Sequence, residues 1–159
     1  MNLQLFLGSI GLALLALPGF ARANDAERLV DCLNQPPTYA DMQQQCWDAF
    51  FRSCITPYES DDWASQTACF LSFKEVTDGI ASRSHIAAQK HPHDFGKRFV
   101  AAAWKLALRE AEAGCDFVVE TSREFGADTQ YDQMLFAQCY AGEIAKAIPN
   151  INAWQGNRD

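Results

Sequence analysis

The sequence predicts an all-α fold: a small helical bundle built on an antiparallel helical hairpin and stapled by three disulfides. Apolar residues recur at three- and four-residue steps along most of the chain, as they do on one face of an α-helix. The six cysteines form an even set, which in an exported chain is typical of a disulfide framework. The longest pair of helical patterns, residues 95–148, forms the predicted hairpin.

Residues 1–23 form a predicted secretory signal peptide. The stretch 3–17 is almost wholly apolar, and Ala21, Arg22 and Ala23 supply a small-x-small cleavage site. The apolar stretch is shorter than the ~20 residues that a helix needs to cross a bilayer. We therefore expect a periplasmic or secreted protein that does not insert into the membrane after cleavage. Its single domain would span residues 24–148, followed by a tail over residues 149–159.

The predicted protein is acidic. The chain has 20 acidic and 13 basic side chains, a formal net charge of −7, and loss of Arg22 with the signal peptide makes it one unit more negative. This balance disfavours nucleic acid and anionic membranes as partners and favours a basic protein.

Three further helices are expected before the hairpin. The first covers residues 26–33, and the second covers residues 39–54 with a capping-box start at Thr38 and Asp41. The third begins at a cap supplied by Ser60 or Asp61 and extends to about residue 87. The predicted inward faces are Met42, Cys46, Ala49 and Phe50 on the second helix, and Cys69, Phe70, Phe73, Val76 and Ile80 on the third.

The hairpin has two arms joined by the small and polar residues 126–128. Thr129 and Asp132 have the spacing of a capping box at the start of the second arm, and Pro149 is expected to end it. We expect Trp154, in the tail, to dock on the bundle. The predicted contact faces are Val100, Trp104, Ala107, Ala111, Cys115 and Val118 on the first arm, and Tyr131, Leu135, Cys139 and Gly142 on the second.

Antiparallel arms bring Cys115 and Cys139 together. A disulfide there closes a loop of roughly 25 residues, worth about 3 kcal/mol by the loop-entropy estimate.

The other four cysteines fall in a weak internal repeat. Each copy has a cysteine, a Pro-containing loop, a hydroxyl residue that can cap a helix, and a second cysteine followed by an aromatic residue. The repeat suggests that Cys32 pairs with Cys46 and that Cys54 pairs with Cys69. Cys46 cannot pair with Cys54, because eight residues of one helix separate them by about 12 Å. Nested pairing, Cys32 with Cys54 and Cys46 with Cys69, stays open.

Candidate chemistry in the sequence is sparse. His91 and His93 with Asp94 could offer two nitrogens and a carboxylate to zinc, but a catalytic zinc needs ligands positioned on rigid elements, and these residues lie in a predicted surface loop. Asp116 and Glu120 lack the apolar setting that a general acid–base pair needs. We predict no catalytic residue, no metal site and no cofactor, and hence a protein that is not an enzyme.

The candidate partner-binding residues lie in the acidic connector before the third helix. Glu59, Asp61 and Asp62 precede Trp63, an aromatic residue beside several charges, as at many protein interfaces. An ordinary solvated loop that leads into a helix cap is the alternative interpretation.

Several residues follow the pattern of a known family. They are Gln66, Thr67, Ala68, Cys69, Asp78, Ala101, Ala102, Ala103, Trp104, Arg109, Cys115, Gly126 and Cys139, with Thr38, Asp41, Met42 and Cys46 nearer the amino terminus. This arrangement resembles the lysozyme inhibitor family typified by the LprI protein, a family of small exported bacterial helical domains. The chain departs from the family at Ala81, Ser82 and His85, where the family has Leu, Asn and Tyr, so the resemblance transfers no binding residue.

The resemblance implies an exported domain that binds protein, with a muramidase of the lysozyme type as the leading target. A structural or chaperone-like cell-envelope protein is the alternative hypothesis. A metal-dependent enzyme built on the His91 and His93 loop is a third.

Overall fold

The computed structural model describes residues 18–35 and 40–156, with side chains described for residues 24–35 and 42–151. These residues form α-helices and no strand, which confirms the predicted all-α fold. The helices are α1 (Pro18–Leu33), α2 (Ala40–Ile55), α3 (Trp63–Lys90), α4 (Phe95–Glu124) and α5 (Thr129–Gly156).

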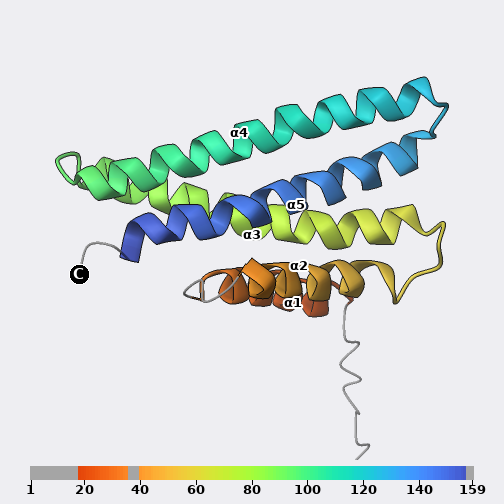
Figure 1. Ribbon diagram of the computed structural model, residues 1–159, viewed down its shortest axis with the longest axis horizontal. Helices are drawn as coiled ribbons and strands as arrows, with labels where there is room; N and C mark the ends of the chain where they lie inside the picture. The colour runs from red at the N-terminus through yellow and green to blue at the C-terminus, as the bar shows by residue number, and fades with distance from the viewer. Residues whose placement is uncertain (1–17, 36–39, 157–159) are drawn as a thin grey trace, which may run out of the picture.

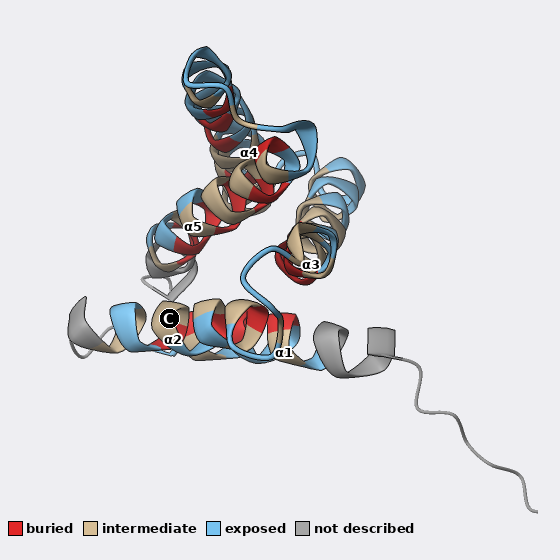
Figure 2. Cartoon of the chain, turned by 90° about the vertical axis from the view of Figure 1, so that its right-hand side faces the viewer, coloured by how far each residue is buried: buried red, intermediate tan, exposed pale blue. Residues whose placement is uncertain are grey.

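The three long helices lie above a shorter pair (Figure 1). Helices α4 and α5 form the predicted hairpin, α3 lies beside them, and α1 and α2 pack together beneath. Helix α5 contacts α4, α3 and α1, so it is the central helix of the bundle. Helix α4 contacts α5 and α3 and lies at the edge of the molecule, with its far side exposed (Figure 2).

An aromatic cluster joins α2 to α3. The ring centroid of Phe50 lies 5.6 Å from that of Phe73 and 6.1 Å from that of Phe70, which it meets edge-on. All three rings are buried. Buried aromatic side chains remove a large apolar area from water, so this cluster holds the short lower pair of helices against the long ones.

Three disulfides connect consecutive helices, and the pairings favoured by the repeat and the hairpin are confirmed. The bonds are Cys32–Cys46, Cys54–Cys69 and Cys115–Cys139, with Cα–Cα distances of 5.9, 5.4 and 5.7 Å. The nested alternative is therefore wrong. Disulfides of this kind are typical of proteins from oxidising, extracytoplasmic compartments.

Two predicted helix caps are wrong. Asp62, rather than Ser60 or Asp61, caps α3 by accepting a hydrogen bond from the Ser65 amide at 3.1 Å. At the start of α5, Asp128 takes the position predicted for Thr129. Its carboxylate accepts bonds from the amides of residues 130 and 131, both at 2.8 Å.

Pro149 does not end the last helix, which continues to Gly156. A proline inside a helix lacks one N–H donor, so the carbonyl four residues earlier loses its partner. Ile148 and Ile151, on either side of it, are both buried. Burial of these apolar side chains offsets the lost hydrogen bond and keeps the chain helical.

The inward faces are largely as predicted, with three corrections. Val119 is buried on α4 whereas Val118 is exposed, because a four-residue step from Cys115 faces α5 better than a three-residue step. Ala49 of α2 is also exposed. On α5 the predicted residues are only partly buried. The buried ones are Asp132, Met134, Ala137, Tyr140, Ala141, Ile144, Ala145, Ile148 and Ile151, because this helix is surrounded by three others.

Some predictions fall outside the described residues: most of the signal peptide, the Thr38 and Asp41 cap, and the side chain of Trp154. Helix α1 starts at Pro18, upstream of the predicted residue 26. Among the described residues, no helix combines the length and the apolar character needed to cross a membrane.

Candidate partner-binding surface

Two loops meet at one end of the bundle. The connector between α2 and α3, residues 56–62, and the turn between α4 and α5, residues 125–128, both lie on the right in Figure 1. Trp63, which follows the connector, packs edge-on against Tyr131 of α5, with ring centroids 5.2 Å apart and planes at 78°. This aromatic contact joins the acidic connector to the hairpin end.

The connector is a structured turn. The amide of Asp62 donates to the Glu59 carbonyl at 3.1 Å, and the amide of Trp63 donates to the Asp61 carbonyl at 2.8 Å. Gln66, which is buried, donates its side-chain amide to the same Glu59 carbonyl at 3.1 Å. The acidic side chains therefore project from a backbone with a fixed conformation.

The four candidate binding residues have different structural roles. Glu59 and Asp61 are exposed, and their carboxylates are available to a partner. Asp62 uses its carboxylate to cap α3. Trp63 is half-buried because its ring packs against Tyr131, so only part of the side chain is available to a partner. The connector thus offers two free carboxylates and one aromatic edge.

A groove of about 570 Å³ opens beside Trp63. It is lined by Trp63, Val118, Thr121, Ser122, Phe125, Gly126, Ala127, Asp128, Tyr131 and Leu135. The side chain of Phe125 is 86% exposed at its rim. An aromatic ring exposed beside a groove is typical of a protein-contact surface, because burying it against a partner releases a large apolar area from water.

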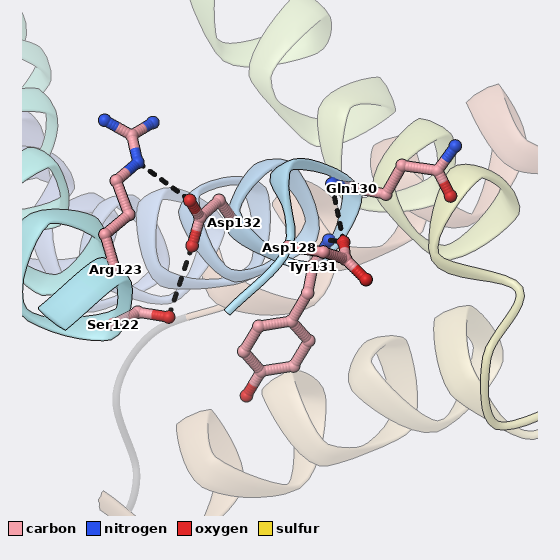
Figure 3. Close-up of polar contacts among 6 residues, drawn as sticks. All are labelled: Ser122, Arg123, Asp128, Gln130, Tyr131 and Asp132. Carbon is pink, nitrogen blue, oxygen red and sulfur yellow. Dashed lines mark hydrogen bonds and ion pairs between the residues drawn. The ribbon is translucent and has the colours of Figure 1, made fainter. Parts of the chain in front are cut away.

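The turn that carries Phe125 has a fixed shape. Gly126 has φ +82°, a left-handed conformation that favours glycine. Two residues after Gly126, the Asp128 carboxylate accepts hydrogen bonds from the two backbone amides at the start of α5 (Figure 3). The conformation of Gly126 and the cap at Asp128 therefore fix the turn that forms the rim of the groove.

Asp132 ties the two arms together next to the groove. Its carboxylate accepts a hydrogen bond from Arg123 Nε at 2.8 Å and another from Ser122 Oγ at 3.2 Å (Figure 3). Asp132 is buried, so these two partners satisfy a carboxylate that is largely withdrawn from water. The capping-box spacing instead predicts that Asp132 caps its own helix.

A second, smaller pocket of about 390 Å³ lies nearby, between α3, α4 and α5. Its lining is Thr67, Leu71, Asp116, Val119, Arg123, Thr129, Asp132, Gln133 and Phe136. The Thr67 hydroxyl oxygen is buried without a hydrogen-bond partner in the structure. Because both pockets are lined by residues next to the α4–α5 turn, they lie at the same end of the hairpin.

The loop that contains His91 and His93 does not bring a set of metal ligands together. His91 and His93 are exposed, and Asp94 caps α4 through the Lys97 amide at 3.1 Å. That hydrogen bond is the main reason why the pKa of Asp94 lies below its ordinary value. Within the part of the chain that the structure describes, no three histidine, cysteine or carboxylate side chains are grouped as metal ligands.

Tyr140 is a second group with a shifted pKa among the described residues. Burial raises the pKa of its phenol, and the nearby carboxylates Asp78 and Glu112 raise it further. The Lys74 ammonium lies 5.1 Å from the ring centroid. Tyr140 lies in the core between α5 and its neighbours, away from both pockets. It therefore has a packing role.

The sequence predictions placed no emphasis on Phe125. Its position directly before Gly126 was the available clue, because a residue at the tip of a helical hairpin is rarely covered. Comparison with protein-family models, curated proteins and solved structures found no match to this chain.

Proposed function

We propose that this chain is an exported protein-binding domain, and that its partner is a basic muramidase of the lysozyme type. The observation that carries the proposal is the hairpin end. There the exposed ring of Phe125 borders a groove that is also lined by Trp63. The exposed residues Glu59 and Asp61 belong to the connector that leads into Trp63.

Charge supports a basic partner. The net charge of −7 steers a positively charged protein toward the domain, and the groove adds a local apolar contact. The three disulfides support export to the periplasm or the medium, where such a partner would be met. The sequence resemblance to the LprI-like inhibitors points to the same class of target.

The test is lysis of bacterial cell walls by a c-type lysozyme, measured with the oxidised protein at low and high salt. The protein is expressed from its full-length sequence and purified with its disulfides intact. We expect dose-dependent inhibition that weakens as salt screens the charges. Absence of inhibition at large molar excess and low salt would favour the structural or chaperone-like alternative.

Two variants locate the surface. Phe125→Ser should weaken inhibition about tenfold or more, as expected for a central aromatic contact. Its matched control is Ile86→Ser, another exposed apolar residue, at the opposite end of α3. The double charge reversal Glu59→Lys with Asp61→Lys should also weaken inhibition.

The control for the charge reversal is Glu27→Lys with Glu75→Lys, which changes the net charge equally on exposed positions of α1 and α3. Equal losses in the two double variants would show that only net charge matters and would remove the connector from the binding surface.

A further inference from the structure

The outer face of α4 carries a line of large exposed apolar side chains. Phe95, Leu106 and Phe117 are 63%, 58% and 70% exposed, and they follow one another at 11-residue intervals. Eleven residues make three helical turns with about 20° of drift, so these side chains fall in one line. This line, the α4 stripe, lies opposite the buried face of α4 that carries Trp104 and Cys115.

The α4 stripe includes smaller residues at positions in the same line. Ala102 and Ala113 are exposed between the large side chains. The Phe95 ring stacks on the half-buried ring of Phe99, with centroids 6.2 Å apart. The result is a row of large and small apolar side chains about 33 Å long between Phe95 and Phe117.

The charges of α4 divide sharply between its two halves. Residues 95–109 contain four basic side chains and no acidic one, whereas residues 110–124 contain five acidic side chains and one basic. This order opposes the helix dipole, which favours acidic residues near the amino end and basic residues near the carboxyl end. Stability of the isolated helix therefore does not account for the charge pattern.

We infer that a second copy of this chain covers the α4 stripe, with the two α4 helices antiparallel about a twofold axis at Leu106. The axis places each Phe95 opposite Phe117 of the other copy, because both lie 11 residues from Leu106. It also places residues 95–105, with three basic side chains and no acidic one, against residues 107–117, with three acidic side chains and one basic. A parallel arrangement would bring like charges together and is disfavoured.

The same axis sets specific pairs at the edge of the stripe. Arg98 and Asp116 are both exposed and are five full turns apart, so they lie on the same side of the stripe. In the antiparallel dimer Arg98 of one copy is level with Gly114 of the other, about 3 Å along the helix from Asp116, and its long side chain can reach that carboxylate, twice per dimer. Ala113 of one copy likewise lies opposite Phe99 of the other, a small residue against a large one.

Sedimentation equilibrium of the oxidised protein, expressed from its full-length sequence, tests the inference. We expect a monomer–dimer equilibrium with a dissociation constant in the micromolar range that rises with salt. Leu106→Glu places two carboxylates at the axis and should raise that constant at least tenfold. Ile86→Glu is the matched control, since Ile86 is 46% exposed but lies on α3, and it should have no effect.

A charge swap tests the register. Arg98→Asp and Asp116→Arg should each weaken the dimer, and the double variant should restore it because both pairs are re-formed with reversed sign. Far-UV circular dichroism confirms that each variant is folded. A monomer at all concentrations, an unaffected Leu106→Glu dimer, or a double variant no better than the singles would overturn the inference. Lysozyme inhibition is a separate readout, because Arg98, Leu106 and Asp116 do not line the groove beside Trp63.

Discussion

Asp132 of α5 accepts a 2.8 Å hydrogen bond from Arg123 of α4, although the Asp132 side chain is 4% exposed and the Arg123 side chain is 62% exposed. The guanidinium reaches from the surface to a carboxylate beneath it. The contact fixes the end of the hairpin that forms the groove.

Loss of the Arg123 side chain should therefore be costly. Arg123→Ala leaves the buried carboxylate with Ser122 as its remaining side-chain partner, so we expect a loss of about 1–3 kcal/mol in the free energy of unfolding. Urea unfolding of the oxidised protein measures it. Lys146→Ala is the control, because Lys146 and Glu143 form an exposed pair that should contribute about 0–1 kcal/mol. Equal losses in the two variants would contradict the structural role of Asp132.

Two glycines should respond to alanine in opposite directions. Neither Gly126 nor Gly114 has a neighbouring atom within 4 Å of an added Cβ, so the backbone decides the effect. Gly126→Ala forces alanine to φ +82° and should destabilise by about 1–2 kcal/mol. Gly114→Ala, inside helix α4, should stabilise by about 0.5–1 kcal/mol. Thermal unfolding distinguishes them, and a shift of the same sign in both would contradict the left-handed turn.

The raised pKa of Tyr140 predicts a loss of stability in alkali. Its phenol ionises at a higher pH in the folded protein than in the unfolded chain, where the pKa is 10.0. The stabilisation is therefore complete below pH 10 and is lost progressively as the pH rises above it. Tyr140→Phe should show a smaller loss between about pH 9 and about pH 11 in urea unfolding.

The fold was predictable where local and long-range patterns agree. Residues 126–128 predict a turn, helical periodicity predicts the two arms, and together they bring Cys115 to Cys139, as the structure confirms. The predictions failed where a side chain forms its hydrogen bonds with a neighbouring helix instead of its own helix. Thr129 and Asp132 have capping-box spacing, but the carboxylate of Asp132 faces Arg123 of α4, which no local pattern reveals.

Pro149 was mispredicted for a related reason. Its sequence neighbourhood indicates a helix end, and only the packing of Ile148 and Ile151 in the core explains why the helix continues. Only part of the candidate partner-binding surface was predictable from the sequence. Trp63 was recognised from its acidic neighbours, whereas the groove beside it depends on Tyr131, almost 70 residues away, and on the exposure of Phe125.

The order of the three disulfides affects how the protein is made. Each cysteine is bonded to the next one in the sequence: the first to the second, the third to the fourth and the fifth to the sixth. In a chain that emerges amino terminus first, both cysteines of each pair are present before either cysteine of the next pair arrives. No correct bond requires an earlier one to be broken, so simple oxidation in order of emergence yields the native set, and thiol–disulfide reshuffling is unnecessary.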